Sequence, residues 1–224
     1  MKHFLLFVFL SFFLMYNSSA QLFTGGVKAG IVGSQVDGDT YSGFNKAGIF
    51  GGGYVNLRIA DIEDSPVENL IQDDSIKFHS FWDLSAFQME LAYMQKGSRK
   101  NPNYEKEDFE QYLLRTDYVE LAILYQFLYS EKLAFELGPA FGYLMHTYEE
   151  RDQQIAASVP FRKTVVNYIG GIYYFLNDRT GVNLRVNNSI LSLRDADRKP
   201  YDKRRFFHYG QFHVALVLSV QFRL

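Results

Sequence analysis

Charged side chains recur inside several apolar stretches of the chain, and their spacing would bring them to one surface. Glutamates and basic residues occupy positions that alternate with aliphatic and aromatic ones. A period of two is typical of a β-strand, in which successive side chains point to opposite faces. Carboxylates and cations buried on a shared face must pair, because an isolated buried charge is costly. The predicted members of this network are Lys28, Arg58, Glu90, Lys96, Glu120, Glu136, Arg185 and Arg223.

Three kinds of chemistry could use such a network. A set of salt bridges would hold the strands together, a chain of charges would conduct ions or protons, and two carboxylates would act as general acid and base. The sequence fixes no spacing between two particular glutamates, so we predict no catalytic site and favour the structural network. Small residues expected on the same face leave room for the long side chains: Gly30, Ala122, Gly138, Ala140 and Gly142.

Eight stretches carry the alternation, and the last is the clearest. Within residues 208–223, Val214, Leu216 and Leu218 fall on one face, whereas His213 and Ser219 fall on the other. The remaining stretches are residues 25–36, 44–59, 81–96, 115–129, 132–148, 164–176 and 180–193, of which 164–176 is apolar on both faces.

The connections between these stretches distinguish a membrane barrel from a soluble sheet. Short links follow the fourth and sixth stretches, at Ser130-Glu131 and Asn177-Asp178-Arg179, whereas residues 97–114, 149–163 and 194–207 form long polar links. Short turns on one rim and long loops on the other are typical of outer-membrane barrels. We therefore predict an all-β fold, an eight-stranded antiparallel closed up-and-down transmembrane β-barrel. At this size side chains fill the interior.

The sequence of the first twenty residues predicts that the protein is exported from the cytoplasm. Lys2 and His3 precede an apolar run from Phe4 to Tyr16, and small residues lead to Ala20. This pattern predicts a signal peptide over residues 1–20 and one outer-membrane barrel domain over residues 21–224. A membrane-spanning helix is the alternative, although the apolar run is short for one.

Composition limits the chemistry further. The chain has no cysteine, which excludes disulfides and thiolate metal sites, and its net charge of −2 gives no footprint for nucleic acid. We predict no enzymatic activity, no cofactor and no metal. Aromatic residues near the predicted strand ends fit a membrane boundary: Tyr125, Phe127, Tyr129, Tyr143, Tyr148, Tyr173, Tyr174, Phe175, Phe206, Phe207 and Tyr209.

Two connections carry unbalanced charge. Residues 60–80 are longer than the tight periplasmic turn expected there, and they are read either as a solvated insertion or as a contact surface for a protein partner. Their acidic residues are Asp61, Glu63, Asp64, Glu68, Asp73 and Asp74. Residues 194–208 are read either as a solvated loop or as a contact for lipopolysaccharide or a partner. Their basic residues are Arg194, Arg198, Lys199, Lys203, Arg204 and Arg205.

Several segments resemble one known family. Residues 25–30 read GGVKAG, residues 88–97 read QMELAYMQKG, and residues 136–144 read ELGPAFGYL, while Tyr118-Val119-Glu120 forms an aromatic-apolar-Glu step. In this order they resemble the PorT-type outer-membrane β-barrel family of Bacteroidetes, whose small barrels are porin-like. The resemblance implies an outer-membrane barrel and points to the type IX secretion and gliding system, from which the family name derives. It also implies a bulge at Pro139.

The sequence leaves several functions open. The favoured one is a non-enzymatic barrel with a packed lumen, surrounded by outer-membrane lipid and lipopolysaccharide, that acts as a structural or interaction protein. The alternatives are an accessory component of type IX secretion with a periplasmic protein partner, a narrow solute channel, and a soluble ligand-binding barrel in the periplasm.

Overall fold

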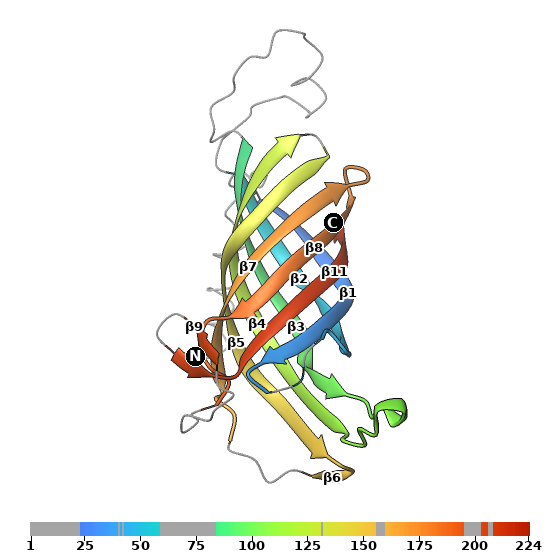
Figure 1. Cartoon of the computed structure of the whole chain (residues 1–224). Coiled ribbons are helices and arrows are strands. Elements are labelled where there is room, and N and C mark those ends of the chain that lie inside the picture. The colour runs from blue at the N-terminus through green and yellow to red at the C-terminus, as the bar shows by residue number, and fades with distance from the viewer. Residues whose placement is uncertain are drawn as a thin grey trace, which may run out of the picture.

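Eight strands close into one antiparallel barrel (Figure 1). A computed structural model describes residues 23–39, 41, 43–58, 84–130, 132–155, 160–194, 203–205 and 208–224. The barrel strands are β1 (Phe23–Asp37), β2 (Lys46–Arg58), β3 (Ser85–Lys100), β4 (Tyr112–Ser130), β5 (Leu133–Arg151), β7 (Thr164–Phe175), β8 (Thr180–Ser189) and β11 (Phe212–Arg223). Short elements occur in the loops: η4 (Tyr104–Lys106), β6 (Gln154–Ile155), β9 (Lys203–Arg205) and β10 (His208–Gly210).

Each barrel strand pairs with the barrel strand before and after it in the chain, and the first and last strands complete the ring. β1 pairs antiparallel with β11, for example at Val27 with Phe222 and at Ile31 with Leu218. Closure satisfies the backbone groups of every strand within the protein, as the hydrocarbon of a membrane requires. The predicted eight-stranded, closed, up-and-down barrel is confirmed.

The alternation read from the sequence separates the two faces of the wall. Outward-facing apolar side chains are exposed, among them Ile31 at 64% and Leu91 at 58%, whereas inward-facing Lys96 and Arg185 are exposed by no more than 1%. A barrel wall with this pattern presents an apolar surface to lipid and a polar one to its lumen.

Short turns form one rim, called here the turn rim. Asn177 shapes the turn between β7 and β8, since its Oδ1 accepts hydrogen bonds from the backbone N–H groups of Arg179 and Thr180 at 3.0 and 2.8 Å. Such a turn is a usual role for asparagine. β1 begins and β11 ends at this rim.

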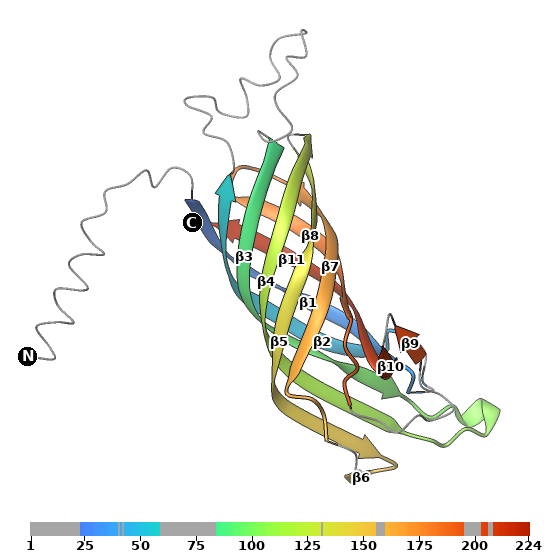
Figure 2. The ribbon, with the colours of Figure 1, turned by 90° about the vertical axis from the view of Figure 1, so that its left-hand side faces the viewer.

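Long loops form the opposite rim, called here the loop rim, where the wall is uneven in height. β4 and β5 have 19 residues each, whereas β8 has 10. The hairpin of β3 and β4, which ends in η4, and the hairpin of β5 and β6 therefore project beyond the rest of the barrel (Figure 2).

The structure changes several local predictions. β3 and β4 extend into residues 97–114, so the connection between them is shorter than predicted. The last predicted strand is interrupted at Gln211, beside Gly210 with a φ of 139°, and divides into β10 and β11. The bulge expected at Pro139 is absent, because the pairing of β4 with β5 keeps one register from Tyr118 to Leu128 and shifts only beyond those residues.

Other predictions concern parts of the chain for which the structure gives no description. Residues 1–20, with the signal peptide, and residues 60–80, with all six acidic residues, lie outside the described residues. Among the described residues, no helix is long and apolar enough to cross a membrane.

Candidate functional site

The part of the lumen nearer the turn rim contains a cluster of charged and polar side chains, called here the Arg185 cluster. Arg185 Nη1 and Nη2 donate to the two carboxylate oxygens of Glu90 at 2.8 and 3.1 Å. Its Nε lies 2.9 Å from Oε1 of Glu136. Because β3 and β8 lie on opposite sides of the ring, the bidentate pair reaches across the lumen. The cluster consists of Lys28, Gln88, Glu90, Glu136, Tyr173, Asn183 and Arg185.

The charges of the Arg185 cluster balance. Lys28 Nζ donates to Glu90 Oε2 at 2.6 Å and also bonds the hydroxyl of Tyr173. Asn183 Nδ2 donates to Glu136 Oε1 at 3.0 Å. The cluster therefore contains two cations and two carboxylates, each with hydrogen bonds that offset its removal from water.

A second cluster, called here the Lys96 cluster, lies nearer the loop rim and consists of Lys96, Glu120, Asn167 and Asn187. Lys96 Nζ donates to Glu120 Oε1 at 2.6 Å and to Asn187 Oδ1 at 2.8 Å. Glu120 also accepts hydrogen bonds from the amides of Asn167 and Asn187 at 2.9 and 2.8 Å. This cluster is neutral as well, with one cation and one carboxylate.

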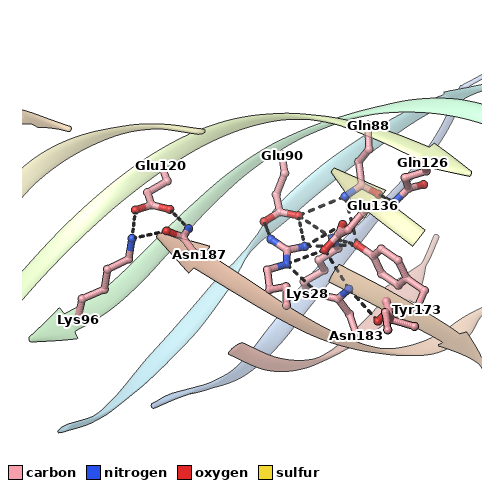
Figure 3. Close-up of polar contacts among 12 residues, drawn as sticks. Lys28, Gln88, Glu90, Lys96, Glu120, Gln126, Glu136, Tyr173, Asn183 and Asn187 are labelled. Carbon is pink, nitrogen blue, oxygen red and sulfur yellow. Dashed lines mark hydrogen bonds and ion pairs between the residues drawn. The ribbon is translucent and has the colours of Figure 1, made fainter. Parts of the chain in front are cut away.

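Apolar side chains separate the two clusters. Along β3 the inward residues run from Glu90 through Ala92 and Met94 to Lys96. One apolar group contains Val32, Phe50, Ala92, Met94, Ala215 and Val217, and another contains Ala122, Leu124, Ala140 and Ile169. Within the described residues, no hydrogen bond or ion pair joins one cluster to the other, and Figure 3 shows them as two groups.

Glycines provide the room that the long side chains need. A Cβ at Gly171 would lie 2.6 Å from Oε1 of Glu136 and 2.8 Å from Cβ of Arg185. A Cβ at Gly142 would lie 2.8 Å from Val165 Cγ2 and 3.4 Å from the carboxylate of Glu120. Both clusters therefore depend on inward positions without side chains.

An apolar group, called here the outer cap, lies at the end of the lumen near the loop rim. Its fully buried members are Val36, Tyr112, Leu114, Tyr118, Val165 and Leu193, and Tyr41, Leu144 and Phe161 pack against them. The carboxylate of Glu149 links Tyr112 of the cap to Arg194, because it accepts hydrogen bonds from Tyr112 at 2.9 Å and from Arg194 at 2.6 Å. Burial also raises the pKa of Asp39, which lies in the loop over this cap, to about 6.

The sequence-predicted network thus separates into three parts. Six of its eight residues form ion pairs within the two clusters, namely Lys28, Glu90, Lys96, Glu120, Glu136 and Arg185. Arg58 and Arg223 instead lie at the ends of β2 and β11 on the turn rim, where Arg58 is exposed and Arg223 half-buried. Neither forms an ion pair with a described residue.

Of the predicted basic loop, the structure describes the side chain of Arg194 alone. Its guanidinium lies 3.9 Å from the centroid of the Phe161 ring and pairs with Glu149, so it belongs to the outer cap. Lys203, Arg204 and Arg205 form β9, which pairs with β10, and only their backbone is described. Arg198 and Lys199 lie outside the described residues.

Sequence reasoning missed several polar members of the clusters. Tyr173 was expected among the aromatics at the membrane boundary, but it is buried in the lumen, whereas the neighbouring Tyr174 is exposed. Its strand is apolar on both faces, so alternation gave no signal for its direction. Gln88, Asn167, Asn183 and Asn187 share the parity of the charged residues, which was the available signal for them.

The described residues contain no group of three or more His, Asp or Glu side chains placed to hold a metal ion. His213, at the start of β11, lies instead within hydrogen-bond distance of Thr116, with Nε2 and Oγ1 3.1 Å apart. These two residues also face each other across the ring.

Residues 73–195 match the family described as the outer membrane protein β-barrel domain, a match that spans more than half of the chain. The chain belongs to this family. Its closed barrel, with an apolar outer face and a polar lumen, is therefore an outer-membrane barrel. A search of curated proteins gives no match.

A comparison with solved structures finds three outer-membrane proteins at low sequence identity. Neisserial surface protein A is 11% identical with a TM-score of 0.49, and the match covers 89% of this chain and 97% of that one. The attachment invasion locus protein Ail of Yersinia pestis is 10% identical with a TM-score of 0.45, covering 90% and 98%. OprG of Pseudomonas aeruginosa is 12% identical with a TM-score of 0.38, covering 90% and 94%.

Proposed function

We propose that this outer-membrane barrel is a non-enzymatic protein that acts through its rims, as a structural or interaction protein, and that its lumen is a closed plug. The observation that carries the proposal is the sequence of layers in the lumen. Two neutral ion clusters alternate with apolar layers, and the outer cap lies above both.

A conducting path needs a continuous row of polar groups or water along the barrel. In this lumen the fixed charges cancel within each cluster, so neither cluster offers an excess charge that would attract a permeating ion. The ion pair of Arg185 with Glu90 and the contact of Lys96 with Asn187 both reach across the ring. Eight-stranded barrels are in general narrow enough for side chains to fill.

The projecting hairpins support a role in contacts outside the membrane. Tyr104 and Phe109, at the tip between β3 and β4, are 73% and 66% exposed, and their rings contact each other with centroids 5.8 Å apart. Exposed aromatic residues are enriched where proteins bind partners.

Planar-bilayer recording of the purified full chain tests the closed lumen. We expect no current steps above the baseline of the protein-free bilayer, in preparations that show the heat-modifiable gel mobility of a folded barrel. Regular conductance steps from such preparations would overturn the proposal in favour of a narrow channel.

A role as an accessory component of type IX secretion is the second candidate. It is supported by the resemblance of residues 88–97 and 136–144 to the PorT-type family. Co-purification with translocon subunits from a Bacteroidetes host, lost when residues 60–80 are trimmed, would support it, and an unchanged yield after trimming would count against it.

N-terminal sequencing of the exported protein tests the proposed cleavage after Ala20.

A further inference from the structure

The end of the lumen at the turn rim carries two arginines that no described carboxylate neutralises. Arg223 shares the inward parity of Gln221 on β11, and Arg58 shares that of Tyr54 on β2. The two arginines lie within electrostatic reach of each other. The other six charges of the predicted lumen network are all paired. Because two like charges held near each other repel, this end of the lumen is suited to receive an anion.

Two neutral donors accompany the arginines. Tyr54 and Gln221 are only 7% and 8% exposed. Within the part of the chain that the structure describes, neither the hydroxyl of Tyr54 nor the side-chain amide of Gln221 forms a hydrogen bond. A covered polar group without a partner is unfavourable, so both groups are available to a ligand that accepts hydrogen bonds.

Glycines bring these donors beside Arg223. Gly26 of β1 pairs with Tyr54 on one side and with Arg223 on the other. A Cβ at Gly26 would lie 2.5 Å from the hydroxyl oxygen of Tyr54, so this hydroxyl lies over Gly26. Gln221 pairs with Gly181, where a Cβ would lie 3.1 Å from Nε2 of the amide. The four inward side chains, called here the turn-rim site, are Tyr54, Arg58, Gln221 and Arg223.

The turn-rim site stays positive when the neighbouring charges are counted. The charges of the Arg185 cluster below it cancel. Among the described residues of the turn rim, the acids are Asp178 and the C-terminal carboxylate, and the exposed cations Arg179 and Lys132 match them in number. Arg58 and Arg223 therefore remain as two cations in excess.

We propose that the turn-rim site binds a doubly charged oxyanion, the phosphate group of a solute. Guanidinium groups bind phosphate oxygens through parallel hydrogen bonds, and a hydroxyl and an amide can donate to the remaining oxygens. Two cations match a dianion in charge, whereas one carboxylate would leave a positive charge in place. The short turns of outer-membrane barrels face the periplasm, so the ligand would reach the site from there. This inference goes beyond the proposed function, since it requires neither a conducting lumen nor a protein partner.

Isothermal titration calorimetry of the purified full chain in neutral detergent tests the site. The probes are inorganic phosphate, phenyl phosphate and acetate, titrated at one ionic strength and at about pH 8, where both phosphates are mainly doubly charged. We expect acetate to bind at least about tenfold more weakly than inorganic phosphate. Binding of phenyl phosphate as well would identify a phosphate group carried by a larger solute, and binding of inorganic phosphate alone would identify the free ion; either supports the site.

Variants assign the binding to the two arginines. Arg58→Gln and Arg223→Gln should each weaken phosphate binding about tenfold, because each removes a charged hydrogen-bond donor. Lys132→Gln is the matched control, since it removes an exposed cation of the same rim from the turn between β4 and β5, and it should bind as the parent does.

Three results would overturn the proposal: no phosphate binding by the parent chain, equal binding of acetate, or unchanged phosphate binding by the double variant Arg58→Gln/Arg223→Gln. If binding is absent from the parent but appears once residues 60–80 are trimmed, the arginines serve the acidic residues of that segment instead of a solute. Heat-modifiable gel mobility checks that each variant is folded. If the double variant fails to fold, Arg58→Gln decides alone, because the exposed side chain of Arg58 forms no hydrogen bond with a described residue.

Discussion

The two ion clusters of the lumen neutralise their glutamates by different means. In the Arg185 cluster, two cations serve two carboxylates, and charges from β1, β3, β5 and β8 meet near the barrel axis. In the Lys96 cluster, one lysine pairs with one glutamate, and amides of Asn167 and Asn187 supply the other donors. The first cluster therefore depends on charge balance across the barrel, and the second depends more on neutral hydrogen bonds.

This difference predicts unequal responses to the loss of a cation. Removal of one partner from a buried ion pair leaves an uncompensated charge, which costs more than the net worth of the pair. A carboxylate that keeps amide donors loses less, since these bonds still offset part of its desolvation.

Replacement of Arg185 should have the largest effect. Arg185→Met leaves Lys28 as the single cation beside Glu90 and Glu136, so we expect a loss of about 3–5 kcal/mol in the free energy of unfolding. Urea unfolding of the detergent-solubilised barrel, followed by gel mobility, measures the loss. The double variant Arg185→Met/Glu136→Gln restores neutrality and should recover part of the stability. If it proves no more stable than Arg185→Met, charge balance is not the cause.

Replacement of Lys96 should cost less. In Lys96→Met the carboxylate of Glu120 keeps its bonds from Asn167 and Asn187, and we expect a loss of about 1.5–3 kcal/mol. The same unfolding measurement, run beside that of Arg185→Met, tests the order of the two effects. A loss at Lys96 equal to or greater than that at Arg185 would contradict the contrast between the clusters.

Parity in the sequence correctly predicted the six charged residues that pair in the lumen, but it could not predict their partners. Lys28 and Arg185 share Glu90 although they are far apart in the chain, because closure of the ring brings β1, β3 and β8 together. The tilt of the strands and the register between them determine which side chains lie in the same layer of the lumen. The alternation within a single strand predicts neither. Arg58 has the right parity but lies beyond the last polar layer, at the end of β2.

The strand β7 shows the limit of the pattern most clearly. Its inward residues include Asn167, Ile169, Gly171 and Tyr173, a mixture of polar, apolar and absent side chains that gives no clear alternation. Each of these residues serves a different layer of the lumen. Asn167 donates a hydrogen bond in the Lys96 cluster, and Ile169 lies in the apolar layer between the clusters. Gly171 leaves space for the Arg185 cluster, and Tyr173 supplies a hydroxyl to it.

Two adjacent glycines of β7 test the packing of the Arg185 cluster with the smallest change in chemistry, the addition of one methyl group. Gly171 faces the Arg185 cluster, where an added Cβ would meet Glu136 Oε1 at 2.6 Å, whereas at Gly170 the nearest atom is Leu137 Cδ1 at 3.9 Å on the outer face. Gly171→Ala should therefore destabilise the barrel by about 1–3 kcal/mol through overpacking. Gly170→Ala, its matched control, should unfold at nearly the same urea concentration as the parent. Equal stability of the two variants would mean that the cluster can shift to accept a methyl group, and that the inward glycine does not define its geometry.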